Sequence, residues 1–207
     1  MPSESQSALK PVLRDIHAWW FGPLAAPTDH NPDKAEIWFK RSDETDAHIR
    51  DTWGPFIAEA MAVAWDLNDL TREEQVGLVL LLDQFPRNIY RETGDAFASD
   101  RKARAIAEAL LIDGPDRFYL VEQTFVCLPF MHSERLEDQR SGEEAFRRSA
   151  REVAAPFRGL FEHGLGFATR HRLVIERFGR FPHRNASLGR DTTPEEARFL
   201  ADTPEGF

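Results

Sequence analysis

The stretch TREEQVGLVLLLDQF, which begins at Thr71, constrains the fold more than any other part of this 207-residue chain. Thr71 and Glu74 have the spacing of a capping box, in which each side chain accepts the other residue's backbone N–H at a helix start. The run from Val76 to Leu82 is apolar throughout, so it predicts a helix that is buried on nearly every face. Proline lacks the N–H that a continuing helix needs, so Pro86 is predicted to end this helix.

Apolar residues recur at helical spacing through most of the remaining chain. Val12, Ile16 and Trp19 fall on one helical face, with Pro11 at a position that a first helical turn tolerates. Caps predict three further helix starts, at Asn31, at Ser42, and at Thr193, which forms a second capping box with Glu196. One buried stripe is expected after Ser42, through Ile49, Trp53, Phe56 and Ala60. An apolar stretch further along is predicted to end at Pro129.

These signals amount to eight or nine helices and no convincing strand, so the predicted fold class is all-α. The short links favour antiparallel neighbours, which suits either a compact bundle or an α-α solenoid. The residue spacing typical of the roughly 34-residue tetratricopeptide repeat is absent, so any repeat here is degenerate. The length suits one core, and we expect a single helical domain over residues 1–207 in which residues 1–7 and 204–207 are loose.

Composition excludes several classes of protein. The formal net charge is -9, whereas a general nucleic-acid binder needs a surplus of Lys and Arg. Cys127 is the single cysteine, which excludes an intramolecular disulfide and fits a reducing compartment. The first residues do not have the pattern of a signal peptide, and no run approaches the roughly 18 apolar residues of a membrane span. We therefore expect a cytoplasmic protein that binds neither nucleic acid nor membrane.

All five tryptophans lie in the first third of the chain, at spacings that fit helix faces. A base-stacking surface would interleave exposed aromatic residues with basic ones. Here the usual neighbours are Asp and Glu, so we expect the tryptophans to pack in the core.

Three polar segments interrupt the apolar pattern: DQFPRNIYR from Asp83, LPFMHSE from Leu128, and RFGRFPHRNASLGR from Arg177. Pro86 and Pro182 are each predicted to end a helix, whose last carbonyls an Arg and an Asn side chain can satisfy. Bracing of this kind accounts for the pairs Arg87-Asn88 and Arg184-Asn185. It leaves four cations without a role, Arg177, Arg180, His183 and Arg190, for which Asp83 and Glu134 are candidate acidic partners. Bracing and ligand binding both remain open.

Catalytic patterns of common types are absent. His132 and Glu134 could belong to a metal site, with His171, His183 or Asp83 as further ligands, but a His-x-Glu pair on a helix points its side chains about 200° apart. Ser133 between them cannot complete a catalytic triad, because adjacent side chains diverge. Cys127 is predicted to be a small buried hydrophobe, and no glycine-rich phosphate loop occurs. We therefore predict no metal and no cofactor.

The three segments, in this order and with Trp38-Phe39 before them, resemble the most characteristic stretches of the mainly bacterial proteins called domain of unknown function 924. The resemblance covers residues 10 to 203. It implies a tetratricopeptide-like α-α superhelix and no established activity. The residues at its motif positions are Asp83, Gln84, Arg87, Asn88, His132, Ser133, Glu134, Arg184, Asn185 and Arg190. The chain departs from the pattern after Arg91, where the family often has a glycine.

Three hypotheses about function follow. In the first, the three segments form one cleft of a helical binding module that holds an anionic small molecule or peptide. Its candidate ligand-binding residues are Asp83, Gln84, Arg87, Asn88, His132, Ser133, Glu134, Arg180, His183, Arg184, Asn185 and Arg190. In the second, His132 or His183 is the general acid or base of an enzyme, oriented by Glu134 or Asp83, with or without a metal. In the third, the segments only brace helices and a protein partner binds elsewhere.

Overall fold

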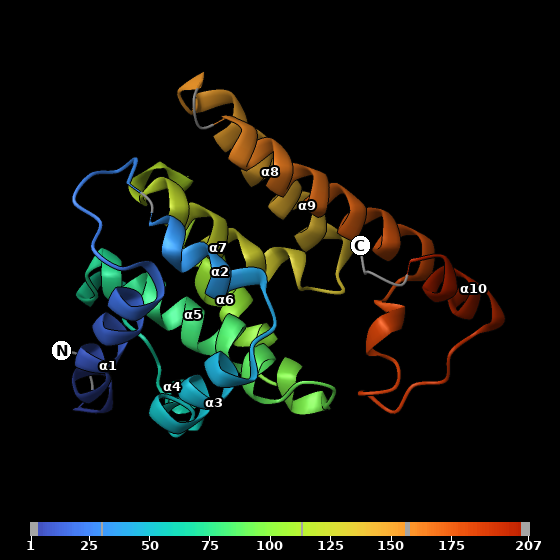
Figure 1. The fold of residues 1–207 in the computed structure, drawn as a ribbon, viewed down its shortest axis with the longest axis horizontal. Coiled ribbons are helices and arrows are strands. Elements are labelled where there is room, and N and C mark those ends of the chain that lie inside the picture. Colours follow the sequence, from blue (N-terminus) through green and yellow to red (C-terminus); the bar gives the residue numbers. More distant parts are fainter. Residues whose placement is uncertain (1–3, 30, 113, 156–157, 204–207) are drawn as a thin grey trace. The chain divides into compact units, whose positions relative to one another are not determined.

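The computed structural model describes residues 4–29, 31–112, 114–155 and 158–203, and these ranges contain ten α-helices and no strand (Figure 1). The all-α prediction is confirmed, with slightly more helices than the predicted eight or nine. Tetratricopeptide-like packing stays a prediction. The contacts divide the chain into two compact units: unit 1 comprises residues 1–91 and 95–126, and unit 2 comprises residues 92–94 and 127–207. That the whole chain is a single domain also stays a prediction.

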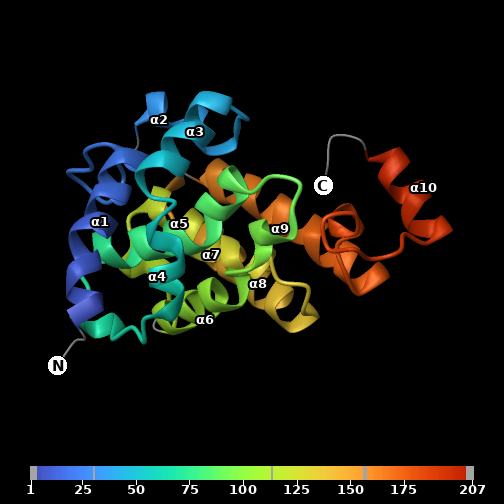
Figure 2. The ribbon, with the colours of Figure 1, turned by 90° about the horizontal axis from the view of Figure 1, so that it is seen from below.

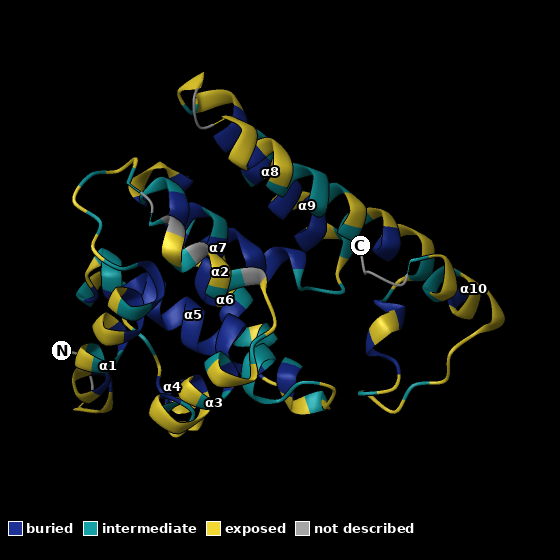
Figure 3. Cartoon of the chain, viewed as in Figure 1, coloured by how far each residue is buried: buried dark blue, intermediate teal, exposed yellow. Residues whose placement is uncertain are grey.

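Unit 1 is built around one central helix, α5 (Arg72–Ile89), which packs against α1 (Glu4–Phe21), α3 (Asp43–Thr52), α4 (Phe56–Ala62) and α6 (Asp100–Leu110) (Figures 1 and 2). The other helices of this part are α2 (Pro32–Phe39) and α7 (Leu120–Met131), and the boundary between the units falls within α7. Every residue of α5 from Glu74 to Pro86 is buried, as Figure 3 shows. The prediction of a helix buried on nearly all faces is therefore confirmed.

The caps predicted in this unit are present at the starts of α2, α3 and α5. The Thr71 hydroxyl accepts the Glu74 N–H at 3.3 Å, and Glu74 Oε2 accepts the Thr71 N–H at 2.9 Å. Asn31 caps α2 and Ser42 caps α3. Local sequence therefore determines where these helices begin.

Pro86 does not end α5, which continues to Ile89. A proline inside a helix leaves the carbonyl four residues earlier without its N–H donor. Here that carbonyl belongs to Leu82, and the Ser99 hydroxyl donates to it at 2.5 Å. The prediction was wrong because a tertiary hydrogen bond replaces the one that the proline removes.

Two other prolines lie inside helices. Pro11 falls in the interior of α1, because this helix begins at Glu4, and α7 passes Pro129 and ends at Met131. The start of α1 also corrects the expectation of a loose segment at residues 4–7. Gln6 is fully buried, donates to the Asp66 carbonyl at 3.1 Å and accepts the Asp66 N–H at 2.8 Å. Residues 1–3 and 204–207 lie outside the described residues.

The helix predicted to follow Ser42 is divided in two. α3 ends at Thr52, and α4 begins at Phe56. Pro55 disfavours helical backbone at Gly54 and brings no N–H of its own, so the chain turns between them. The predicted stripe still faces inward at Ile49, Trp53 and Ala60, while Phe56 is half-buried.

The tryptophans have structural roles, as predicted, although only two of them are fully inside. Trp20 and Trp53 are buried, and Trp20 packs edge-on against Phe125 with ring centroids 5.5 Å apart. Trp38 and Trp65 are half-buried and donate to backbone carbonyls, and half-buried Trp19 stacks on Trp53 at 4.9 Å. These contacts place the aromatic side chains in and around the core of unit 1.

Unit 2 is a helical hairpin followed by a compact C-terminal segment. α8 (Leu136–Glu152) packs along α9 (Arg158–Phe178), and after the short 3-10 turn η5 (Pro182–Arg184) the chain enters α10 (Pro194–Asp202) (Figure 1). Thr193 and Glu196 form the second predicted capping box, at the start of α10. One apolar cluster of this unit comprises Val174, Ile175 and Phe181, with Leu136, Phe178 and Phe199 packed against it.

Pro182 does not end a helix either. α9 ends at Phe178, where Gly179 takes a φ of 69° and donates to the Ile175 carbonyl at 2.8 Å. This left-handed glycine terminates the helix, because residues with a Cβ rarely adopt that conformation. Within the described chain, no helix combines the length and the apolar character that crossing a bilayer needs.

Candidate functional site

The first polar segment lies on the last turns of α5, in unit 1. Asp83 is fully buried, accepts a hydrogen bond from Gln84 Nε2 at 2.5 Å, and lies 3.4 Å from Arg87 Nη1. Arg87 also donates from Nη1 to the Asp83 carbonyl and from Nη2 to Asp100 Oδ2 at 2.9 Å. Since Asp100 is the first residue of α6, Arg87 connects α5 to α6.

Asn88 connects α5 to a different helix. Its Nδ2 donates to Asp46 Oδ1 at 2.8 Å, and Arg91 binds both oxygens of the same carboxylate. Burial alone would raise the pKa of Asp46, but the hydrogen bonds from Arg91 and Asn88 outweigh it and hold the pKa below its ordinary value. Asn88 thus helps to fasten α3 to α5.

The second segment comprises the end of α7 and most of the turn to α8, in unit 2. Ser133 donates from its hydroxyl to Asp138 Oδ2 at 2.6 Å and accepts the Arg135 N–H at 3.2 Å. The backbone N–H of His132 donates to the Leu128 carbonyl at the end of α7. Ser133 therefore stabilises the start of α8.

Gln139 was missed by the sequence reasoning. It is fully buried, and its Nε2 donates to the carbonyls of Phe130, Met131 and Ser133 at 3.2, 2.7 and 2.6 Å. Phe130 and Met131 are the last residues of α7 and Ser133 lies in the turn after it, so one side chain satisfies carbonyls at the end of the helix that Pro129 was expected to stop. An amide placed on the inward face of an otherwise polar helix is the signal that could have found it.

Glu134 joins the second segment to the third. Arg190 donates to its carboxylate from Nη1 at 2.7 Å and from Nη2 at 2.9 Å, and the Phe181 N–H donates to Oε1 at 2.8 Å. Burial raises the pKa of Glu134, but the hydrogen bonds from Arg190 and Phe181 lower it by a larger amount, so the pKa lies below its ordinary value. The predicted role of Glu134 as an acidic partner is confirmed for Arg190, and this pairing commits its carboxylate to a structural contact.

Arg190 makes further contacts within the third segment. Its Nε donates to Asn185 Oδ1 at 3.1 Å, and its Nη2 donates to the Phe181 carbonyl at 3.0 Å. Asn185 is buried, with Nδ2 3.3 Å from both Thr192 Oγ1 and Glu196 Oε2. Arg190 and Asn185 therefore hold the loop between η5 and α10 in one conformation.

Arg180 is paired with Glu196, the residue that also completes the capping box of α10. Its Nε and Nη2 donate to the two carboxylate oxygens at 2.6 and 2.9 Å. The hydrogen bonds from Arg180 and from the Thr193 backbone lower the pKa of Glu196 to about 2. The sequence indicated the cap but did not indicate that the same carboxylate binds Arg180.

Arg177 pairs with Glu195 at 2.9 Å on the surface and lies over the Phe178 ring, 4.7 Å from its centroid. Three arginines of the third segment, Arg177, Arg180 and Arg190, therefore have carboxylate partners in unit 2. They are three of the four cations that the sequence left without a role.

His183 and Arg184 gather around the Phe181 ring together with His171 of α9. The His171 and His183 rings each lie 5.5 Å from the Phe181 ring between centroids, and the Arg184 guanidinium carbon lies 4.6 Å from its centroid. Partial burial, then Arg184 and His171, lower the pKa of His183, and His132 acts in the same direction. We call His132, His171, His183 and Arg184 the histidine–arginine cluster.

Two further kinds of group discussed in the sequence are a metal site and the Cys127 thiol. The described residues contain no group of three or more His, Cys, Asp or Glu side chains placed to hold a metal ion. Burial raises the pKa of the Cys127 thiol to about 12, so at neutral pH it is a buried apolar side chain, as predicted. General acid-base chemistry by His132 or His183 stays a prediction.

The segments meet in part. Asp83, Gln84 and Arg87 interact with one another in unit 1, where Asn88 instead contacts Asp46. Glu134, Asn185 and Arg190 interact in unit 2, and Arg180 joins them through Glu196. That all three segments form one cleft stays a prediction.

Comparison with known proteins places the chain among uncharacterised relatives. The model of a family described as bacterial proteins of unknown function, DUF924, matches residues 16–204. A solved structure of a protein of unknown function from Agrobacterium tumefaciens is 33% identical, with a TM-score of 0.73, over 95% of this chain and 99% of that one. No curated protein matches the chain.

Proposed function

Because the chain belongs to the DUF924 family of bacterial proteins, for which no activity is described, we propose a function from the geometry of unit 2. We propose that the protein is a binding module and that the histidine–arginine cluster holds an anionic group. That group would be the carboxylate or phosphate of a small molecule or peptide.

The observation that carries this proposal is the gathering of basic side chains around the Phe181 ring. Arg177, Arg180 and Arg190 of the third segment bind Glu195, Glu196 and Glu134. His183 and Arg184 of the same segment lie beside the Phe181 ring together with His171. Groups that become positive are therefore concentrated at one place in a chain that is acidic as a whole.

Electrostatics indicates what such a place favours. Burial lowers the pKa of His183 most, and Arg184, His171 and His132 lower it as well, so desolvation and nearby positive charge both oppose protonation of this ring. Glu134 acts in the opposite direction, but its carboxylate is already held by Arg190. A bound anion would counter the repulsion and favour the protonated imidazole, so anion binding should be accompanied by proton uptake.

Nuclear magnetic resonance of the histidine rings tests the proposal, with inorganic phosphate and succinate as probes. Either probe should raise the pKa of His183 by about one unit or more if it binds at the cluster. His163, an exposed histidine of α9 outside the cluster, is the internal control and should not respond. The stronger of the two probes then indicates whether the natural ligand carries a phosphate or a carboxylate.

Two variants separate binding from folding. His183→Asn and Arg184→Gln should each lower the affinity for the probe by about tenfold, the loss expected for one charge-assisted hydrogen bond. Arg184 also stacks on buried Phe181, so Arg184→Gln is interpreted only after thermal melting shows that it folds. An unchanged His183 titration in the presence of both probes would overturn the proposal, as would an equal response of His163.

A further inference from the structure

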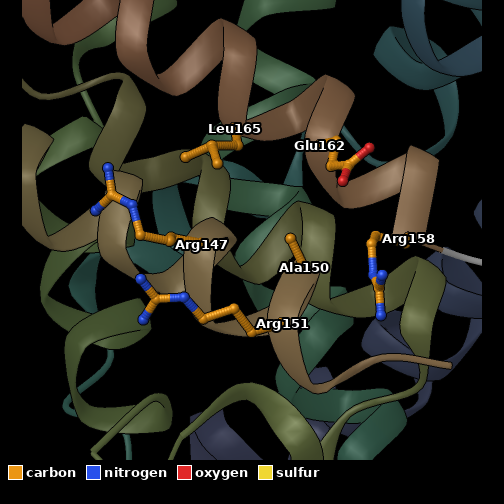
Figure 4. A pocket seen from close by; sticks show the side chains of 6 residues that line it. All are labelled: Arg147, Ala150, Arg151, Arg158, Glu162 and Leu165. Carbon is orange, nitrogen blue, oxygen red and sulfur yellow. The ribbon is translucent and has the colours of Figure 1, made fainter. Parts of the chain in front are cut away.

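A second group of arginines lies on the α8–α9 hairpin, at positions outside the three polar segments. A hollow of about 380 Å³ is lined by side chains of both helices, with Arg147, Ala150 and Arg151 from α8 and Arg158, Glu162 and Leu165 from α9 (Figure 4). Figure 4 shows the two arginines of α8 on one side of Ala150 and Arg158 on the other. None of these six residues belongs to the segments discussed above.

The positive charge of the hollow is only partly compensated. Arg147 is paired with Glu143 and Glu144, at 2.7 Å in each case. Among the residues that the structure describes, neither Arg151 nor Arg158 has an ion-pair partner, and both are exposed. Three arginines and one glutamate line the hollow, so its lining carries two more positive charges than negative ones.

The placement of these arginines is unfavourable without a ligand. Arg147 and Arg151 are four residues apart on one helix, where like charges repel each other. Arg158 is the first residue of α9, a helix whose first turn carries no acidic residue, and a cation there opposes the helix dipole. An anion bound between the helices would reduce both the repulsion between Arg147 and Arg151 and the unfavourable interaction of Arg158 with the helix dipole.

The other lining residues indicate the shape of the ligand. Ala150 is buried and Leu165 is half-buried, so one wall of the hollow is apolar. A guanidinium binds a phosphate through parallel N–H donors, and two uncompensated guanidinium groups match the double charge of a phosphate monoester better than a single carboxylate. An apolar substituent on that phosphate would contact Ala150 and Leu165.

We propose that the hollow binds a phosphate monoester with an apolar substituent. Arg151 and Arg158 donate to the phosphate oxygens, and Leu165 contacts the substituent. This site is independent of the histidine–arginine cluster, because the two share no residue.

Isothermal titration of the full chain with phenyl phosphate tests this site. The compound should bind, and benzoate, which has the same ring and one charge fewer, should bind about tenfold more weakly. Arg151→Gln and Arg158→Gln should each lower the affinity for phenyl phosphate by about tenfold or more. Arg148→Gln is the matched control, because Arg148 is a neighbouring arginine that pairs with Glu152 and does not line the hollow.

Glu162→Gln gives a test that a misfolded variant cannot imitate. Removing the one carboxylate of the lining should tighten phenyl phosphate binding by a few-fold. The proposal is overturned if phenyl phosphate does not bind, if benzoate binds equally well, or if Glu162→Gln leaves the affinity unchanged. It is also overturned if binding survives Arg151→Gln and Arg158→Gln but is lost in His183→Asn, a result that would place the phosphate at the histidine–arginine cluster instead.

Discussion

Unit 1 and unit 2 are both helical, but different interactions stabilise them. In unit 1 most of one helix is buried, and the Trp20 ring packs against Phe85 and Phe125 with centroids 5.7 and 5.5 Å apart. In unit 2 the apolar cluster around Phe181 has three buried residues. The loops of this unit are joined by the ion pairs of Arg190 with Glu134 and of Arg180 with Glu196. The stability that comes from burying apolar area depends little on pH, whereas an ion pair between an arginine and a carboxylate is lost when the carboxylate is protonated.

The α8–α9 hairpin of unit 2 shows the same reliance on charge. Glu143 accepts hydrogen bonds from Thr169 and Arg172 of α9 and from Arg147 of its own helix. Burial raises the pKa of Glu143, but the hydrogen bonds from Arg172 and Thr169 lower it by a larger amount, so the pKa lies below its ordinary value. The comparison therefore predicts that acid weakens unit 2 before it weakens unit 1.

The largest expected effect is the loss of a core ring in unit 1. Phe85→Ala should lower the free energy of unfolding by about 3–5 kcal/mol, because Phe85 is fully buried on α5. Phe199→Ala in unit 2 is the matched control and should cost clearly less, since Phe199 is only half-buried. Denaturant unfolding measures both, and equal costs would mean that the two cores are alike.

A close backbone approach gives an effect nearly as large. A Cβ atom at Gly77 would lie 2.1 Å from the Leu13 carbonyl oxygen, so α1 and α5 can cross this closely only at a glycine. Gly77→Ala should therefore cost about 3 kcal/mol. A denaturation midpoint equal to that of the wild type would show that α1 does not pack on α5 in this way.

The ion pairs of unit 2 should give intermediate effects. A double-mutant cycle with Glu134→Gln and Arg190→Gln is expected to yield a coupling energy of about 1–2 kcal/mol, because the pair is bidentate and partly buried. The exposed pair of Arg177 and Glu195 is the control and should couple by less than about 0.5 kcal/mol. Equal coupling in the two cycles would contradict the structural role given to Glu134.

The pH dependence of stability has a definite sign at His183. Its pKa in the folded protein lies below the ordinary value of 6.5, so the unfolded chain binds its proton first as the pH falls. The contribution of neutral His183 to the free energy of unfolding is complete above pH 6.5. It is lost as the pH falls from there toward the pKa of His183 in the folded protein. His183→Asn should accordingly show a smaller loss of stability between pH 7 and pH 4.5 than the wild type. A loss of the same size would mean that His183 is not the titrating group.

The smallest expected effect concerns the proline inside α5. Ser99→Ala should cost about 1 kcal/mol, because it removes the hydrogen bond to the Leu82 carbonyl, to which Pro86 cannot donate. Pro86→Ala restores a backbone N–H four residues later, so Ser99→Ala should cost less in that background than in the wild type. Equal costs in both backgrounds would contradict the account of how α5 passes Pro86.

Local signals predicted the helices of both units well, and distant contacts explain the errors. The cap at Thr71 and the apolar run after it require only a few neighbouring residues, so the sequence indicates them directly. Pro86 was misjudged because Ser99, which replaces the missing hydrogen bond, lies on the far side of a loop. Gln139 was missed for the same reason, since the carbonyls that it binds belong to the end of the preceding helix and to the turn after it.

The candidate site was predicted less completely than the fold. Glu134 was correctly suggested as an acidic partner, because it is one of the few acids in the three polar segments. The sequence could not show that Glu195 and Glu196 neutralise Arg177 and Arg180, since any of the chain's 35 acidic residues could have done so. Of the four cations that the sequence left without a role, the fold pairs three with carboxylates and places His183 beside the Phe181 ring.

Hydrogen exchange measured separately for the two units tests the comparison most directly. After correction for the intrinsic effect of pH on exchange, lowering the pH from 7 to 4 should reduce the protection of α9 and of the segment from Arg180 to Glu196. The protection of α5 should change much less, because apolar burial dominates there. A loss of protection in α5 that equals or exceeds the loss in unit 2 would contradict the claim that ion pairs hold unit 2 and an apolar core holds unit 1.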